Sequence, residues 1–130
     1  KLVEVQLALG DAYRTTKQWE KAKNAFYKAL RMKSDLPQAH YNLALMYLSA
    51  GAEFPGMDLL TALGKAKEEF GVYRSMMGSR LARDDASTGY LEDIEKAVAR
   101  EQKRIEREKK AAEQAAKKAA EAAKPAGENQ

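Results

Sequence analysis

Side chains that could carry out chemistry are few in this 130-residue chain. Its single histidine is His40, and it contains no cysteine. A histidine forms a catalytic triad only with a nucleophile and an orienting carboxylate nearby. Without cysteine, the chain has no thiol nucleophile, zinc–thiolate site or disulfide. We therefore interpret His40 as a packing residue, and we expect neither enzymatic activity nor a cofactor.

Two pairs of adjacent carboxylates, Glu68-Glu69 and Asp84-Asp85, are the other chemical candidates. Neighbouring helical residues do not face each other, so we interpret these groups as solvated or helix-capping. The glycines at positions 51, 56, 64, 71, 78 and 89 are too scattered for a phosphate-binding loop. The sequence therefore predicts no metal site and no nucleotide site.

The sequence predicts that helices position any functional residues. The evidence is a pattern of apolar and small residues that occurs twice in the chain. Leu9-Gly10 is followed by Tyr13, and 34 residues later Leu43-Ala44 is followed by Tyr47. The first copy continues through Trp19, Ala22, Phe26 and Ala29. This order of large and small residues resembles the tetratricopeptide repeat (TPR), a helix-turn-helix unit of 34 residues. The resemblance implies an all-α solenoid that binds other proteins.

Helical spacing predicts a first helix over residues 3–15 and a partner over 19–32. We expect the first to bury one stripe of side chains, made of Val5, Leu9, Ala12 and Tyr13. Gly10 lies on this stripe, which indicates close approach of the partner helix, with Ala22 opposite and Phe26 beyond. Lys17 occupies the turn position where these repeats usually carry glycine.

The second copy begins after Pro37, in residues 38–50, and stops at Gly51. Residues 52–56 form a longer turn than usual, and apolar spacing predicts a helix over 57–77. A loop over 78–89 leads to an apolar stripe over 90–105 that could cap the open end of the repeats. The predicted segments are repeat 1 (1–36), repeat 2 with an inserted turn (37–78), a loop and capping helix (79–105), and an Ala/Lys/Glu-rich helical or disordered tail (106–130).

Basic residues concentrate toward the C-terminus. Residues 100–124 hold nine Lys or Arg and five Glu, and they account for the whole net charge of +4. Six of the cations could attract anionic lipid or nucleic acid: Arg100, Lys103, Arg104, Arg107, Lys109 and Lys110. Interspersed glutamates dilute this field, and no aromatic residue follows Tyr90 to stack on bases, so nucleic acid is the less expected partner. We interpret the segment as a solvated spacer, with residues 128–130 disordered.

The resemblance to TPR arrays also predicts a binding surface. In such arrays the first helix of each repeat lines a concave groove that holds a peptide or a partner helix. The matching positions here are Leu7, Asp11, Arg14, Tyr41, Leu45 and Leu48, with Glu4 at the edge. Their apolar members lie off the predicted core stripes, as in a binding patch. They differ from the lysines and asparagines with which chaperone-binding members clamp a carboxylate, so that ligand class is not expected.

A second resemblance concerns the C-terminal half. Tyr73-Arg74-Ser75-Met76-Met77-Gly78, then Asp84-Asp85, Tyr90-Leu91 and residues 105–110 are similar to the ends of bacterial TPR lipoproteins of gliding-motility and envelope complexes. This implies a periplasmic or outer-membrane-associated component, with a cytoplasmic location as the alternative. The chain opens with Lys1 in a pattern that is already helical, so we expect a piece of a longer protein whose N-terminal anchor could also give membrane association.

Overall fold

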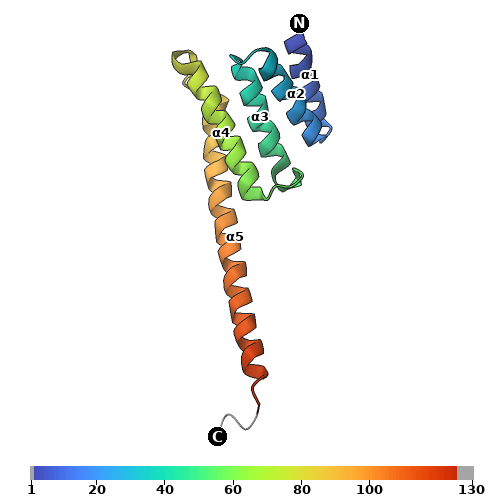
Figure 1. Ribbon diagram of the computed structural model, residues 1–130. Coiled ribbons are helices and arrows are strands. Elements are labelled where there is room, and N and C mark those ends of the chain that lie inside the picture. The colour runs from blue at the N-terminus through green and yellow to red at the C-terminus, as the bar shows by residue number, and fades with distance from the viewer. Residues whose placement is uncertain (1, 126–130) are drawn as a thin grey trace. The chain divides into compact units, whose positions relative to one another are not determined.

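The computed structural model describes residues 2–125, and within them the chain is helical without any β-strand (Figure 1). The helices are α1 (Leu2–Thr15), α2 (Trp19–Met32), α3 (Pro37–Ala50), α4 (Leu59–Met77) and α5 (Ala86–Ala122), with short 3-10 helices η1 (Gly51–Glu53) and η2 (Gly78–Arg80). This confirms the predicted fold class. The chain divides into two compact units, Lys1–Val98 and Ala99–Gln130. The predicted disorder of residues 128–130 lies outside the described residues.

In the first unit, helices α1 to α4 pack side by side in chain order (Figure 1). Helices α2, α3 and α4 supply most of the core, and α3 lies between the other two. The buried cluster consists of Trp19, Ala22, Phe26, Leu43, Ala44, Met46, Tyr47, Ala50, Phe54, Leu63, Ala66, Phe70 and Ile94. Burial of an apolar stripe on each helix is what holds such a stack together.

Gly10 is a point of close contact between α1 and α2. A Cβ atom built on Gly10 would lie 2.3 Å from Cε1 of Phe26, whose side chain is fully buried. The predicted close approach is therefore confirmed, but the group that faces the glycine is the Phe26 ring and not Ala22. Only a residue without a side chain leaves room for this ring.

Of the predicted stripe on α1, Tyr13 is half-buried and packs against the core cluster, but the other three residues are exposed. Val5 is 51% exposed, Leu9 is 39% exposed, and Ala12 is also exposed. The reason is that α2 and α3 cover α1 from one side only. On the other side no helix of residues 2–125 packs against it, so an apolar stripe that the pattern assigns to a core stays in contact with solvent.

The turn between α1 and α2 depends on Lys17. Its φ of 61° is the one positive value at a non-glycine residue in the described chain. The Gln18 amide donates to the Tyr13 carbonyl at 2.8 Å, and the Lys17 amide donates to the Arg14 carbonyl at 3.1 Å. These two bonds form a Schellman motif, whose left-handed position usually holds glycine. The turn thus keeps the repeat's geometry although the glycine is replaced.

We predict that Lys17→Gly raises the free energy of unfolding by about 0.5–1 kcal/mol. A left-handed conformation costs a non-glycine residue about 1–2 kcal/mol, and the greater freedom of glycine in the unfolded chain offsets part of the gain. The matched control is Lys33→Gly at the end of α2, where φ is −149°. Urea denaturation of both variants measures the difference. Stabilisation by both, or by neither, would contradict this explanation.

The inserted turn after α3 is part of the core. Phe54 is buried, and its ring centroid lies 5.5 Å from that of Tyr47. Gly51 starts the turn at φ 51°, and Gly78 starts the corresponding turn after α4 at φ 52°. In both turns the amide three residues on donates to the glycine carbonyl at 3.2 Å. Of the inserted turn over residues 52–56, Phe54 therefore folds inward onto the core, while the other four residues are exposed.

Helix α5 begins earlier than the sequence predicts, because a polar cap starts it at Ala86. The carboxylate of Asp85 accepts hydrogen bonds from the Ser87 amide at 3.0 Å and the Ser87 hydroxyl at 2.6 Å. It also accepts one from the Tyr73 hydroxyl at 2.8 Å. The capping interpretation of Asp85 is thus confirmed, whereas the loop predicted over 78–89 is wrong for residues 86–89, which are helical.

The cap fixes the start of α5 to α4. Arg74 donates to the Ser87 hydroxyl at 2.8 Å, and Ser87 is fully buried. The hydrogen bonds from Ser87, and then that from Tyr73, lower the pKa of the Asp85 carboxyl below its usual range. A lowered folded-state pKa stabilises the fold at pH values above the unfolded-state pKa. This contribution is lost as the pH falls through the folded-state value.

Candidate partner-binding surface

The predicted groove residues lie on two helices that contact each other. Leu7, Asp11 and Arg14 lie on α1, and Tyr41, Leu45 and Leu48 lie on α3. All six are half-buried. The four apolar members pack against the core cluster while part of their surface stays open. The groove residues are therefore the outer layer of the core and not an independent patch.

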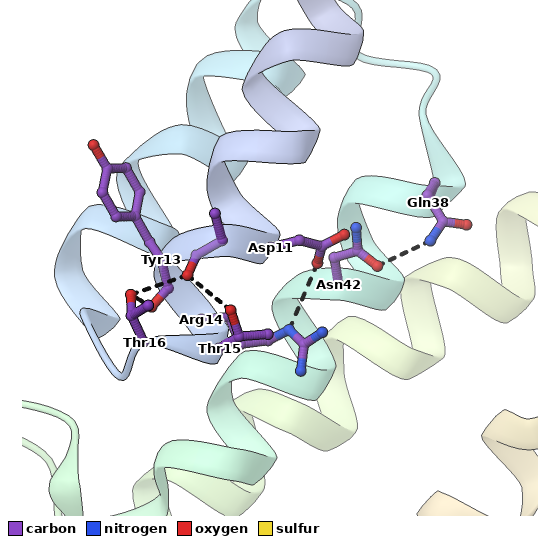
Figure 2. Close-up of polar contacts among 8 residues, drawn as sticks. Asp11, Tyr13, Arg14, Thr15, Thr16, Gln38 and Asn42 are labelled. Atoms are coloured by element: carbon purple, nitrogen blue, oxygen red, sulfur yellow. Dashed lines mark hydrogen bonds and ion pairs between the residues drawn. The ribbon is translucent and has the colours of Figure 1, made fainter.

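The groove residues Asp11 and Arg14 form an ion pair that is not a hydrogen bond. Oδ1 of Asp11 lies 3.6 Å from Nε of Arg14, and both atoms are buried without a hydrogen-bond partner. Figure 2 shows the pair on α1, with Asp11 pointing toward Asn42 on α3. The side chains of Arg14 and Asp11 keep 25% and 46% of their surface exposed. Their remaining polar atoms are thus open to a partner.

The polar neighbour on α3 was not predicted from the sequence. Asn42 is buried, and its Oδ1 accepts a hydrogen bond from Nε2 of Gln38 at 2.9 Å (Figure 2). Asparagine is seldom buried unless it is hydrogen-bonded. The signal that could have indicated it is its place directly before Leu43-Ala44, in the middle of the repeat motif.

Tyr41 lies at the centre of an aromatic cluster. Its ring meets Phe70, Tyr73 and Tyr90 edge-on, with centroid distances of 5.6, 4.9 and 6.5 Å. Phe70 and Tyr90 stack at 5.4 Å. Such edge-on and stacked pairs contribute about 0.5–1.5 kcal/mol each beyond their buried area. Tyr41 therefore joins α3 to α4 and to the start of α5, and a substitution there would change folding as well as binding.

His40 has a partner that the sequence analysis missed. Nδ1 of His40 lies 2.6 Å from Oε2 of Glu69, and the two side chains are 15% and 12% exposed. The interpretation of Glu69 as a solvated group is thus wrong, because Glu69 falls on the buried side of α4, one turn after Ala66 and next to Phe70. The contact between these two largely buried side chains connects α3 to α4. His40 therefore contributes to packing through a polar contact.

Two tyrosines complete this polar interior. A hydrogen bond between the side chains of Tyr47 and Tyr27 joins α3 to α2. Burial raises the pKa of the Tyr47 hydroxyl, and the nearby Tyr27 and Glu69 raise it further. Burial raises the pKa of Tyr27 as well. Both hydroxyls therefore stay neutral at physiological pH and act as hydrogen-bonding groups of the core.

No group of three or more His, Asp or Glu side chains within residues 2–125 could hold a metal ion. Within the same residues, none of the helices has both the length and the apolar character that a membrane span requires.

The basic residues of the second unit lie on different sides of α5. Arg104 forms ion pairs with Glu101 and with Glu108, the latter at 2.6 Å. Its hydrogen bonds to the two carboxylates raise the pKa of the guanidinium. Steps of three and four residues place the exposed Arg100, Lys103, Arg107 and Lys110 along another side of α5. This row is turned away from Glu101 and Glu108, whereas Glu106, four residues before Lys110, borders it.

Comparison with protein families identifies one stretch of the first unit. A family model described as "TPR repeat" matches residues 10–51, about a third of the chain. This match supports the TPR resemblance of that stretch. No curated protein matches the chain, and no solved structure matches it. TPR repeats generally mediate protein–protein interaction, and TPR proteins are typically non-catalytic scaffolds.

Proposed function

We propose that the chain is a protein–protein interaction scaffold that holds a peptide or a helix of a partner against the groove residues. The observation that carries this proposal is the surface between α1 and α3, five of whose six groove residues lie within the TPR-matched stretch. It combines half-open leucines with the Asp11–Arg14 pair, whose buried atoms lack hydrogen bonds. Leucines supply apolar anchors, and the charged pair can hydrogen-bond to a partner's polar groups.

Leu45→Asp should abolish partner binding while the fold persists. A carboxylate in an apolar contact loses its hydration, and truncating an anchor typically costs about 2 kcal/mol or more of binding free energy. The matched control is Leu60→Asp, at a half-buried leucine on α4. The immobilised 130-residue chain would be cross-linked to proteins of its source cell, which are then identified by mass spectrometry.

We expect wild type and Leu60→Asp to retain the same proteins and Leu45→Asp to lose them. Circular dichroism must show equal helix content in all three. If a folded Leu45→Asp variant retains every partner, the groove residues are not the binding surface.

A finer proposal is that the scaffold belongs to a bacterial multiprotein envelope complex, such as a gliding-motility machine, in a periplasmic or outer-membrane-associated location. It rests on the resemblance of residues 73–78, 84–85, 90–91 and 105–110 to envelope TPR lipoproteins. Fractionation of the source cells, with detection of this chain, tests it. Recovery in the cytoplasmic fraction alone would overturn it.

A second candidate function uses the basic row of α5. Arg100, Lys103, Arg107 and Lys110 are exposed, and the helix turns them away from the Glu101–Arg104–Glu108 pairs. A row of this kind attracts an anionic membrane or nucleic acid, at about 1 kcal/mol per basic residue near a membrane. It would make the chain an adaptor that binds a partner and an anionic surface together.

Replacement of these four residues by glutamine tests the adaptor function. We expect the wild-type chain to bind vesicles with about 30% anionic lipid at low salt, with binding that weakens as salt rises. The glutamine variant should lose this binding. The adaptor function would be excluded if the wild-type protein binds neither these vesicles nor duplex nucleic acid at low salt.

A further inference from the structure

The side of α1 that faces away from the groove residues carries an exposed apolar row. Leu2, Val5 and Leu9 are 69%, 51% and 39% exposed, and they follow each other at steps of three and four residues. Those steps align side chains along one face of a helix. Leu7, Asp11 and Arg14 occupy the opposite face, so the row is separate from the groove residues.

Helix α2 places cations beside this row. Lys21, Lys28 and Arg31 lie at steps of seven and three residues, along one face of α2, and all three are exposed. With Leu9 and Tyr13 of α1 they line a shallow groove of about 400 Å³. Nζ of Lys21 lies 5.8 Å from the centroid of the Tyr13 ring. Three cations and no carboxylate line this groove.

We propose that this end face, made of Leu2, Val5, Leu9, Lys21, Lys28 and Arg31, docks an amphipathic helix with acidic flanks from a partner protein. A helix in the groove between α1 and α2 would bury its apolar side on the row of α1. It would place its carboxylates against the cations of α2. Exposed apolar rows beside a groove mark interaction sites.

Charge complementarity selects this occupant over a second copy of the chain. A symmetric dimer through the same face would bring Lys21, Lys28 and Arg31 of two molecules together. Like charges across an interface disfavour that pairing. The helical segment 106–122 of a second copy does not fit either, because it contains no large apolar residue. An acidic partner helix with an apolar side, by contrast, would cover the apolar row of α1 and pair with the cations of α2.

A designed pair of peptides tests the inference on the full chain. The probe is a helical peptide of about 18 residues, or five turns. It has leucines at steps of three and four and glutamates on one flank. The matched control peptide has lysines in place of the glutamates. Fluorescence anisotropy of labelled peptide reports binding, and sedimentation velocity reports self-association.

We expect the acidic peptide to bind and the lysine peptide to bind about tenfold more weakly or not at all, with affinity that falls as salt rises. Leu9→Asp and, separately, Lys28→Glu should each weaken binding about tenfold or more. Lys28 is exposed, so its variant should change the stability of the fold by less than about 0.5 kcal/mol. Leu45→Asp should bind like wild type, which distinguishes the end face from the groove residues.

Three results would overturn the inference. The acidic peptide could fail to bind at millimolar concentration, or the lysine peptide could bind equally well. The chain could also form a dimer that Leu9→Asp disrupts, which would make a second copy the occupant. None of these results bears on the proposed scaffold function, which is tested separately by Leu45→Asp.

Discussion

Gly10→Leu is expected to unfold the first helical hairpin, with a loss of about 3 kcal/mol or more in the free energy of unfolding. This is the upper end of the cost of overpacking a core. Even one added carbon would lie 2.3 Å from Cε1 of Phe26 and 2.6 Å from two more ring atoms. Phe26 is fully buried and cannot move aside without displacing its own neighbours.

The same substitution at Gly64 is the matched control. Gly64 lies inside α4, is exposed, and has no heavy atom within 4 Å of an added Cβ. Leucine is a better helix former than glycine by roughly 0.5–1 kcal/mol, so Gly64→Leu should stabilise the chain. Thermal melts followed by circular dichroism compare the variants. Similar melting temperatures for Gly10→Leu and wild type would show that α1 and α2 do not pack around Gly10.

Phe70→Ala is expected to cost about 3–5 kcal/mol, the usual range for a large-to-small change at a buried aromatic residue. Phe70 is fully buried and contacts the rings of both Tyr41 and Tyr90. Its removal leaves a cavity where α3, α4 and the start of α5 meet. Because a small domain has only about 5–15 kcal/mol of net stability, the variant should be partly unfolded near physiological temperature.

Val72→Ala, two residues further along α4, is the control for Phe70. Val72 is half-buried, and alanine's higher helix propensity offsets part of the lost burial, so the cost should be about 1 kcal/mol or less. Urea denaturation curves give both values. Equal, small losses at the two positions would mean that the aromatic cluster is not a main support of the fold.

The helices were predictable because their signals are local. The spacing of Trp19, Ala22, Phe26 and Ala29 places α2 at the bounds that the structure shows, and Pro37 marks the start of α3. The burial of α1 was not predictable in the same way. The Leu2, Val5 and Leu9 row has the pattern of a core stripe, but whether it is covered depends on a neighbour beyond the helix itself.

Interactions between helices distant in sequence were the least predictable part of the candidate site. The His40–Glu69 contact joins residues 29 positions apart, and no local pattern pairs them. Tyr41 was assigned to the groove from its register in the repeat. That register does not reveal that its ring also meets Phe70, Tyr73 and Tyr90 across two other helices.

The one-sided covering of α1 also bears on the dynamics of the chain. Gly10 is its only buried residue, whereas α3, enclosed by α2 and α4, buries seven of its own. Local opening costs least where few apolar contacts must be broken. Helix α1 should therefore detach in brief excursions while α3 stays folded, and its backbone amides should exchange with solvent deuterium before those of α3. The helix that carries residues of both candidate surfaces is thus also the one with the most freedom to adjust to a ligand.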